Sequence, residues 1–142
     1  MTHRSHTLVG AVVVHLFLTA AHGVAHVTIP VPVHDWQTGV ATAVLFVVPI
    51  LGAVLARSGR VRAGSWLVLT AGLGGLAFEG LLHFVVSNPD HVGLVTDGDA
   101  LFLSTAVLTT LGDALLVLAG GWFLFARSRR AFPASVLGGT RQ

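Results

Sequence analysis

Four long apolar stretches, separated by short polar segments, dominate the hydrophobic pattern of the chain. They run over residues 8–29, 36–56, 64–86 and 100–126, and each holds about twenty residues or more. A helix rises about 1.5 Å per residue, so each stretch can cross a hydrocarbon core about 30 Å thick. The pattern predicts an all-α integral membrane protein with four transmembrane helices, in which residues 1–142 form a single membrane domain. Pro49 lies inside the second stretch and predicts a kink there.

The composition agrees with a membrane protein and excludes several kinds of chemistry. The chain is 54% hydrophobic and 10% charged, with a mean hydropathy of +0.82, outside the range of soluble domains. Cysteine is absent, which excludes thiolate chemistry and iron–sulfur clusters. The sequence also contains no phosphate loop, no G-x-S-x-G elbow and no H-E-x-x-H zinc motif. No familiar pattern therefore assigns a catalytic activity.

The arginines predict the orientation of the four spans. There are eight arginines and no lysine, and they precede the first span, connect the second to the third and follow the fourth: Arg4, Arg57, Arg60, Arg62, Arg127, Arg129, Arg130 and Arg141. The connections on the other side carry Asp35, Asp90, Asp97 and Asp99 and no arginine. By the positive-inside rule we expect a multi-pass protein of the cytoplasmic membrane, with both termini in the cytoplasm.

The isoelectric point, about 11.2, does not indicate a nucleic-acid partner. It reflects arginine in the absence of lysine and tyrosine, whereas the net charge is only +2. The expected partner is the lipid bilayer, and further membrane subunits or a homo-oligomer stay open as additional partners.

The first span also fits a second interpretation. Arg4, the apolar run and the small residues at positions 21–23 match a signal peptide with a cleavage site. Apolar character continues past that site to Ile29, and the repeat described next uses residues on both sides of it. We therefore favour an uncleaved first helix.

Two histidine-containing stretches, HGVAHVTIPVPVH (residues 22–34) and EGLLHFVVSNPDH (residues 79–91), align at an offset of 57 residues. The same offset superposes the first span on the third and the second on the fourth. This predicts two αα hairpins related as a parallel repeat, with a pseudo-two-fold axis along the membrane normal. The alternative is a chance alignment of two apolar helices that each end near a proline. The matched pairs are His22 with Glu79, Gly23 with Gly80, His26 with His83, Pro32 with Pro89 and His34 with His91.

The repeat predicts a ligand site near the outer surface. His22 and His26 are spaced i, i+4, as are Glu79 and His83, so each pair occupies one helix face. At about 1.5 Å per residue, His26 and His83 lie about 4–5 Å below the outer boundary, and His22 and Glu79 about 10 Å below it. If the two faces meet, they supply three imidazoles and one carboxylate.

Two kinds of cofactor fit this set of side chains. Imidazole and carboxylate ligands favour a transition metal such as Zn, Cu, Fe or Ni. Alternatively, His26 and His83 could approach the iron of a haem b from opposite sides, because helix bundles often hold cofactors between facing helices. The sequence leaves both alternatives open.

Other polar residues extend the candidate site inward and outward. His15 shares the helix face of His22, and Asp113 lies at a similar depth in the fourth span, so the two form a candidate proton relay or an interhelical polar clamp. At the outer side, His34 with Asp35 and Asp90 with His91 are candidate loop ligands, or solvated loop residues.

Three functions from different classes follow from these residues. The first is a metal- or haem-binding protein, as a small redox or metal-handling subunit. The second is a proton- or ion-conducting or transport element that uses the column of ionisable residues within the membrane. The third is a structural or assembly subunit of a larger membrane complex, in which the polar column only holds the helices together.

Overall fold

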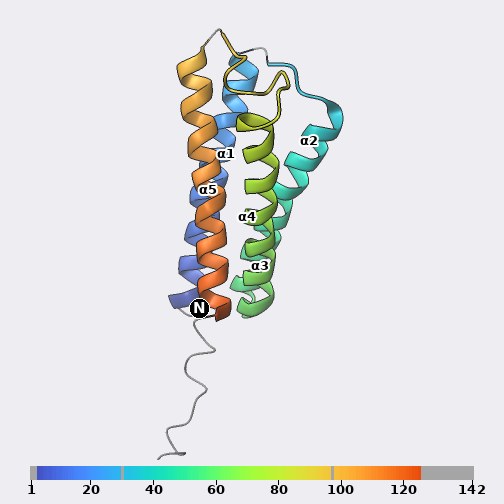
Figure 1. Ribbon diagram of the computed structural model, residues 1–142. Helices are drawn as coiled ribbons and strands as arrows, with labels where there is room; N and C mark the ends of the chain where they lie inside the picture. Colours follow the sequence, from blue (N-terminus) through green and yellow to red (C-terminus); the bar gives the residue numbers. More distant parts are fainter. Residues whose placement is uncertain (1–2, 30, 97, 126–142) are drawn as a thin grey trace, which may run out of the picture.

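The computed structural model describes residues 3–29, 31–96 and 98–125, which form a helical bundle without strands in these ranges (Figure 1). Three spans are single helices, α1 (His3–Thr28), α4 (Val61–Phe84) and α5 (Asp99–Phe125). The remaining span is built from α2 (Asp35–Ala41), the π-helix η1 (Thr42–Val47) and α3 (Val48–Arg57).

Four helical segments are long and apolar enough to cross a membrane, namely His3–Thr28, Asp35–Arg57, Val61–Phe84 and Ala100–Phe125. This confirms the predicted number of spans and the all-helical fold of the described residues. The predicted end of the fourth span at residue 126, the arginines that follow it and Asp97 lie outside the described residues.

The bundle has two unlike ends. One end holds the α1–α2 connection and the segment between α4 and α5, and we call it the loop end. The other holds the start of α1 and the tight turn from α3 to α4, and we call it the turn end. Gly59 adopts a φ of +89° in this turn, a conformation that favours glycine. α5 packs against both α1 and α4, and α3 packs mainly on α4.

The bundle exposes apolar side chains and buries polar ones. Phe17 and Leu118 are 73% and 70% exposed, whereas His15, Thr109 and Asp113 are fully buried. This arrangement is the reverse of that in a water-soluble bundle, where such polar groups face the solvent. It suits a hydrocarbon surround, in which ionisable side chains face the interior of the bundle.

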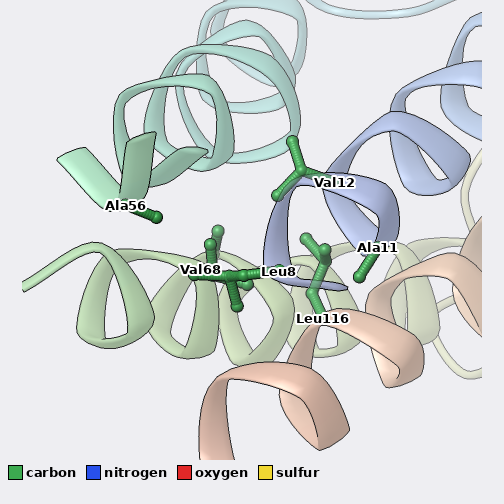
Figure 2. Packing of buried hydrophobic residues seen from close by; sticks show 7 residues of the cluster. Leu8, Ala11, Val12, Ala56, Val68 and Leu116 are labelled. Carbon is green, nitrogen blue, oxygen red and sulfur yellow. The ribbon is translucent and has the colours of Figure 1, made fainter. Parts of the chain in front are cut away.

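The buried apolar core lies toward the turn end (Figure 2). Leu8 and Val12 of α1 pack there with Val68 of α4 and Leu116 of α5, and the small side chains around them let the helices approach. The loop half buries apolar side chains such as Phe102 and Ala106 together with most of the buried ionisable side chains, among them His22, Glu79, His83 and Asp90. The turn half therefore provides a close-packed frame from which the polar half extends.

Glycines allow the helices of this frame to touch through their backbones. A Cβ atom on Gly120 of α5 would lie 2.8 Å from both the Ser65 oxygen and the Leu69 nitrogen of the α4 backbone. Gly72 of α4 lies similarly close to the backbone of α5, since a Cβ atom there would be 2.7 Å from the Asp113 carbonyl oxygen. In lipid, such van der Waals packing replaces the hydrophobic effect as the main attraction between helices.

Neighbouring glycines on α5 provide a matched test of this packing. We expect Gly120→Ala to destabilise the fold by about 1–3 kcal/mol, the usual cost of overpacking. Gly121→Ala should be neutral or stabilising by up to about 1 kcal/mol, because a Cβ there meets nothing within 4 Å and alanine favours helix. Reversible unfolding in mixed micelles measures both values. Equal effects of the two substitutions would contradict the backbone contact.

Candidate metal centre

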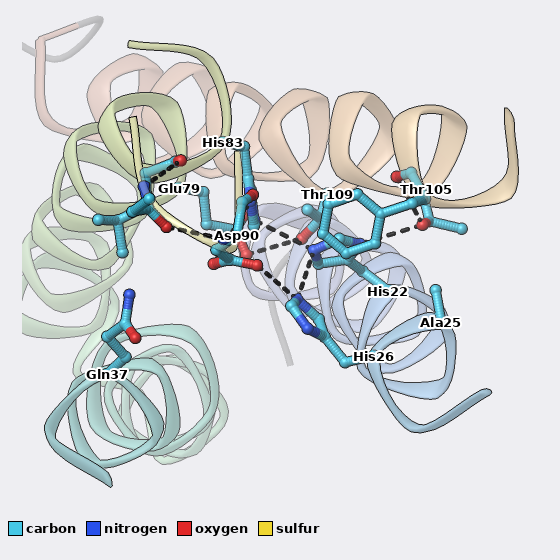
Figure 3. A network of polar contacts seen from close by, with 12 residues as sticks. His22, Ala25, His26, Gln37, Glu79, His83, Asp90, Thr105 and Thr109 are labelled. Atoms are coloured by element: carbon cyan, nitrogen blue, oxygen red, sulfur yellow. Dashed lines mark hydrogen bonds and ion pairs between the residues drawn. The ribbon is translucent and has the colours of Figure 1, made fainter. Parts of the chain in front are cut away.

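Three histidines converge in the loop half of the bundle. His22 Nε2 on α1 lies 3.1 Å from His83 Nε2 on α4 and 3.2 Å from His26 Nε2 one turn along α1 (Figure 3). One ring nitrogen from each residue lies within 4.8 Å of the others, so the group could hold a metal ion. His22 and His83 are buried, and the His26 side chain is 19% exposed at the edge of the group.

The contact on the far side of the His22 ring holds its second nitrogen. His22 Nδ1 lies 3.0 Å from Thr105 Oγ1 on α5, and a hydroxyl can donate to a ring nitrogen or accept from it. When the Thr105 hydroxyl donates to the Leu101 carbonyl at 2.8 Å, its oxygen accepts a hydrogen bond from His22 Nδ1–H. In that tautomer the neutral imidazole of His22 presents a lone pair at Nε2.

A backbone carbonyl fixes the tautomer of His83. His83 Nδ1 lies 3.0 Å from the backbone carbonyl of Asp90, which can only accept a hydrogen bond. The proton of the neutral ring is thus on Nδ1, and Nε2 carries a lone pair. Partners of this kind commonly orient metal-ligating histidines, because they hold the second ring nitrogen.

The loop after α4 folds back over the helix end and brings Asp90 to the histidines. Asn88 Oδ1 accepts the Asp90 N–H at 2.8 Å, an Asx turn, and Asn88 Nδ2 donates to the Leu82 carbonyl at 2.9 Å. Asp90 is 5% exposed, and its Oδ1 lies 3.3 Å from His26 Nε2. The carboxylate therefore closes the loop side of the three-histidine group.

The 3.1 Å contact between His22 Nε2 and His83 Nε2 depends on the His22 tautomer. With the proton on Nε2, His22 donates a hydrogen bond to His83. With the proton on Nδ1, the two Nε2 lone pairs face each other and their close approach is repulsive. A cation between them, either a metal ion or an added proton, removes the repulsion. The arrangement can thus bind a positive ion at the point where the rings meet.

Glu79 lies one turn inward of His83 and belongs to a separate cluster. Its Oε1 accepts a hydrogen bond from the Thr109 hydroxyl at 3.3 Å, and Thr109 also contacts the Thr19 hydroxyl at 3.1 Å. The Glu79 and Asp113 carboxyl groups are close enough to interact electrostatically. The structure thus brings together His22, His26 and His83, and it places Glu79 between them and Asp113.

His15 and Asp113 lie together at the inner end of this cluster. His15 Nδ1 is 3.4 Å from Asp113 Oδ1, and both side chains are fully buried. His15 Nε2 donates to the Leu45 carbonyl at 2.9 Å. In an α-helix this carbonyl would accept the N–H of residue 49, which Pro49 lacks. The predicted irregularity at Pro49 thus takes the form of η1 and a carbonyl that the His15 imidazole satisfies.

The remaining loop candidates lie outside the three-histidine group. His34 is exposed and precedes α2, where its backbone N–H donates to Gln37 Oε1 at 2.8 Å. His91 accepts the Gly93 N–H within its own loop. Thr19 and Gln37 are two further polar residues here that were not predicted from the sequence. Thr19 shares the helix face of His15 and His22, a spacing that could have identified it, whereas Gln37 offers only its isolated polarity near the start of a span.

Comparisons with known proteins assign no relative to this arrangement. No family model matches the chain, and neither a curated protein nor a solved structure matches it.

A double-mutant cycle tests the contact between His15 and Asp113. We expect Asp113→Asn and His15→Ala each to destabilise the protein, because each leaves a buried polar group without its partner. The double variant should lose less than the sum, with a coupling of about 0.5–3 kcal/mol. Unfolding in mixed micelles measures the cycle, and Asp113→Asn combined with His34→Ala is the remote control. Additive losses for His15 and Asp113 would show that the two side chains act separately.

Proposed function

We propose that this protein binds one divalent transition-metal ion through the Nε2 atoms of His22, His26 and His83, as a small metal-handling subunit of the membrane. The observation that carries the proposal is the convergence of one ring nitrogen from each of the three histidines, with the outer nitrogens of His22 and His83 held by Thr105 and the Asp90 carbonyl. A bound ion makes this geometry favourable. The second ring nitrogens of these two histidines already have the outer partners that metal-ligating imidazoles use.

The separations between the ligand atoms support a tetrahedral ion. Bonds of about 2.0–2.1 Å from zinc to imidazole nitrogen place two tetrahedral ligands about 3.3–3.4 Å apart. The observed Nε2 separations are 3.1 and 3.2 Å, so a small expansion admits the ion. The Asp90 Oδ1 atom is 3.3 Å from His26 Nε2 and accepts no other hydrogen bond, which makes it the proposed fourth ligand.

The ligand set also bears on the identity of the cofactor. Three imidazoles with one carboxylate suit Zn²⁺, and also Cu²⁺, Ni²⁺ and Fe²⁺. We favour an ion over haem because the His22 ring, within 3.2 Å of the nitrogens of both His26 and His83, fills the space that a porphyrin between them would need. Among the ions, the two Nε2 separations about His22, 3.1 and 3.2 Å, are close to those of a tetrahedral Zn²⁺ site.

The orientation predicted by the arginines would put this site near the outer face of the cytoplasmic membrane, with both termini inside. The proposed relation of the two hairpins as a parallel repeat would explain why α1 and α4 contribute to one site. In that orientation, His26 and Asp90 at the loop end form the edge of the site that an external ion meets first.

A second function, proton or ion conduction, is supported by two groups of buried polar residues that follow one another along the bundle. The three histidines contact Thr105, and Thr109, Glu79, Asp113 and His15 form a second group deeper in the bundle. Ionisable residues at such depth are costly and often mark proton or ion pathways. The apolar core at the turn end closes the column, so conduction would require that core to open.

Metal titration of the untagged full-length protein tests the first proposal. We expect about one Zn²⁺ per chain, with affinity that falls as the pH falls, because binding needs neutral imidazoles. His22→Ala and His83→Ala should each weaken binding by at least about 100-fold. Thr105→Val, which removes only the outer partner of His22, should weaken it by about 10–100-fold. Calorimetry followed by elemental analysis measures stoichiometry and affinity.

His91→Ala is the matched control, since His91 lies beside Asp90 in the same loop and makes only a local bond to Gly93. It should retain the wild-type affinity. A wild-type protein that takes up no Zn²⁺, Cu²⁺, Ni²⁺ or Fe²⁺, or that loses affinity equally with His91→Ala, would refute the proposed site.

A further inference from the structure

A cavity of about 360 Å³ lies beside the three histidines, between α1, the second span and α4. Its volume is within the range of small-molecule sites. Histidine side chains and Glu79 form one wall, while Phe46 of η1 and Phe78 of α4 contribute aromatic surface. The metal proposal uses the nitrogens at one edge and leaves the cavity itself without a role.

The path of the second span explains why this space exists. α2 leans away from the other helices at the loop end (Figure 1), and η1 connects it to α3, which packs on α4. On the opposite side Gly23 of α1 has no Cβ, and one built there would meet nothing within 4 Å. Gly23 therefore widens the cavity that the departure of α2 opens.

The rim of the cavity is apolar. Val27 and Val33 border it, with exposed fractions of 85% and 39%, and Trp36, whose ring lies edge-on to the ring of Phe78, is 58% exposed. Val27 lies at the end of the first span, Val33 just before the second and Trp36 at its start, so this rim is at the level of the membrane surface. An apolar ligand of the membrane can enter here.

Two buried polar residues that line the cavity can each form a further hydrogen bond. Glu79 is 3% exposed and its carboxyl group interacts with that of Asp113, while its Oε2 atom has no hydrogen-bond partner within bonding distance among the described residues. Gln37 is 4% exposed, and its Oε1 is taken by the His34 N–H, which leaves the amide N–H groups as donors. Figure 3 shows this amide reaching from α2 toward the helix that carries Glu79. An acceptor from α4 and a donor from α2 thus line one apolar space.

We propose that the cavity binds a membrane-soluble aromatic diol of the quinol type. Its ring lies against Phe46 and Phe78, one hydroxyl donates to Glu79 Oε2, and the other oxygen accepts from the Gln37 amide. A lipid tail could fill the apolar part of the cavity but would leave both polar groups unpaired, which is costly in a buried site. The inference extends the proposed function by placing a ligand beside the metal centre, yet the binding itself needs no ion.

Equilibrium binding of tetramethylhydroquinone to the full-length protein in nanodiscs tests this inference. The measurement is made under anaerobic conditions, with and without Zn²⁺, and the dimethyl ether of the same compound is the control ligand. The hydroquinone should bind at one per chain, and at least about tenfold more tightly than the ether, which lacks hydroxyl donors. Binding should persist without Zn²⁺, so failure of the metal proposal and failure of this one are distinguishable.

Matched variants locate the ligand. Gly23→Leu places a side chain in the cavity and should abolish hydroquinone binding while zinc binding persists. Gly121→Leu, on an open surface of α5, should leave both unchanged. Gln37→Leu removes one donor and should weaken hydroquinone binding about fivefold or more, without touching the histidines. Equal affinity for the hydroquinone and its ether, or unchanged binding in both Gly23→Leu and Gln37→Leu, would overturn the proposal.

Discussion

The loop half of this bundle depends on the approach of three imidazole nitrogens to one point. His22 Nε2 and His83 Nε2 lie 3.1 Å apart, and the outer nitrogens of both rings are held by Thr105 and the Asp90 carbonyl. This approach links four elements, because α1 and α4 carry the rings, α5 supplies Thr105 and the loop after α4 supplies Asp90. A cation bound at this point would join all four.

The rest of the molecule holds the three histidines in position without supplying side chains to their group. In the turn half, the apolar cluster and the glycine contacts between α4 and α5 hold the backbones at fixed separation. The central pair of His15 and Asp113 joins the two halves, and His15 also satisfies the carbonyl that Pro49 leaves without a donor. This single side chain hydrogen-bonds to the irregular backbone of the second span. The outer part of that span diverges from the other helices and borders the cavity. Rigidity at one end thus permits an open, polar arrangement at the other.

The sequence predicted much of this arrangement, and its failures have definite physical causes. Length and hydropathy were sufficient for four spans, because a bilayer imposes a minimum helix length. The spacing of His22 and His26, and of Glu79 and His83, placed each pair on one helix face.

Periodicity does not specify which neighbour a face meets, and Glu79 turns out to contact Thr109 on α5 rather than the histidines. Asp90 reaches the site through a loop whose path depends on Asn88, and no periodic pattern describes such a path. Gln37 enters the cavity only because η1 redirects α2, which the presence of Pro49 alone does not predict.

X-ray absorption at the zinc edge of the zinc-loaded protein tests the central claim most directly, because it reports the atoms around the ion. The account predicts about four light-atom ligands at roughly 2.0–2.1 Å, together with the outer-shell scattering of three imidazole rings. An oxygen-only shell without imidazole scattering would mean that zinc sits on carboxylates or water elsewhere in the chain, and would contradict the three-histidine centre.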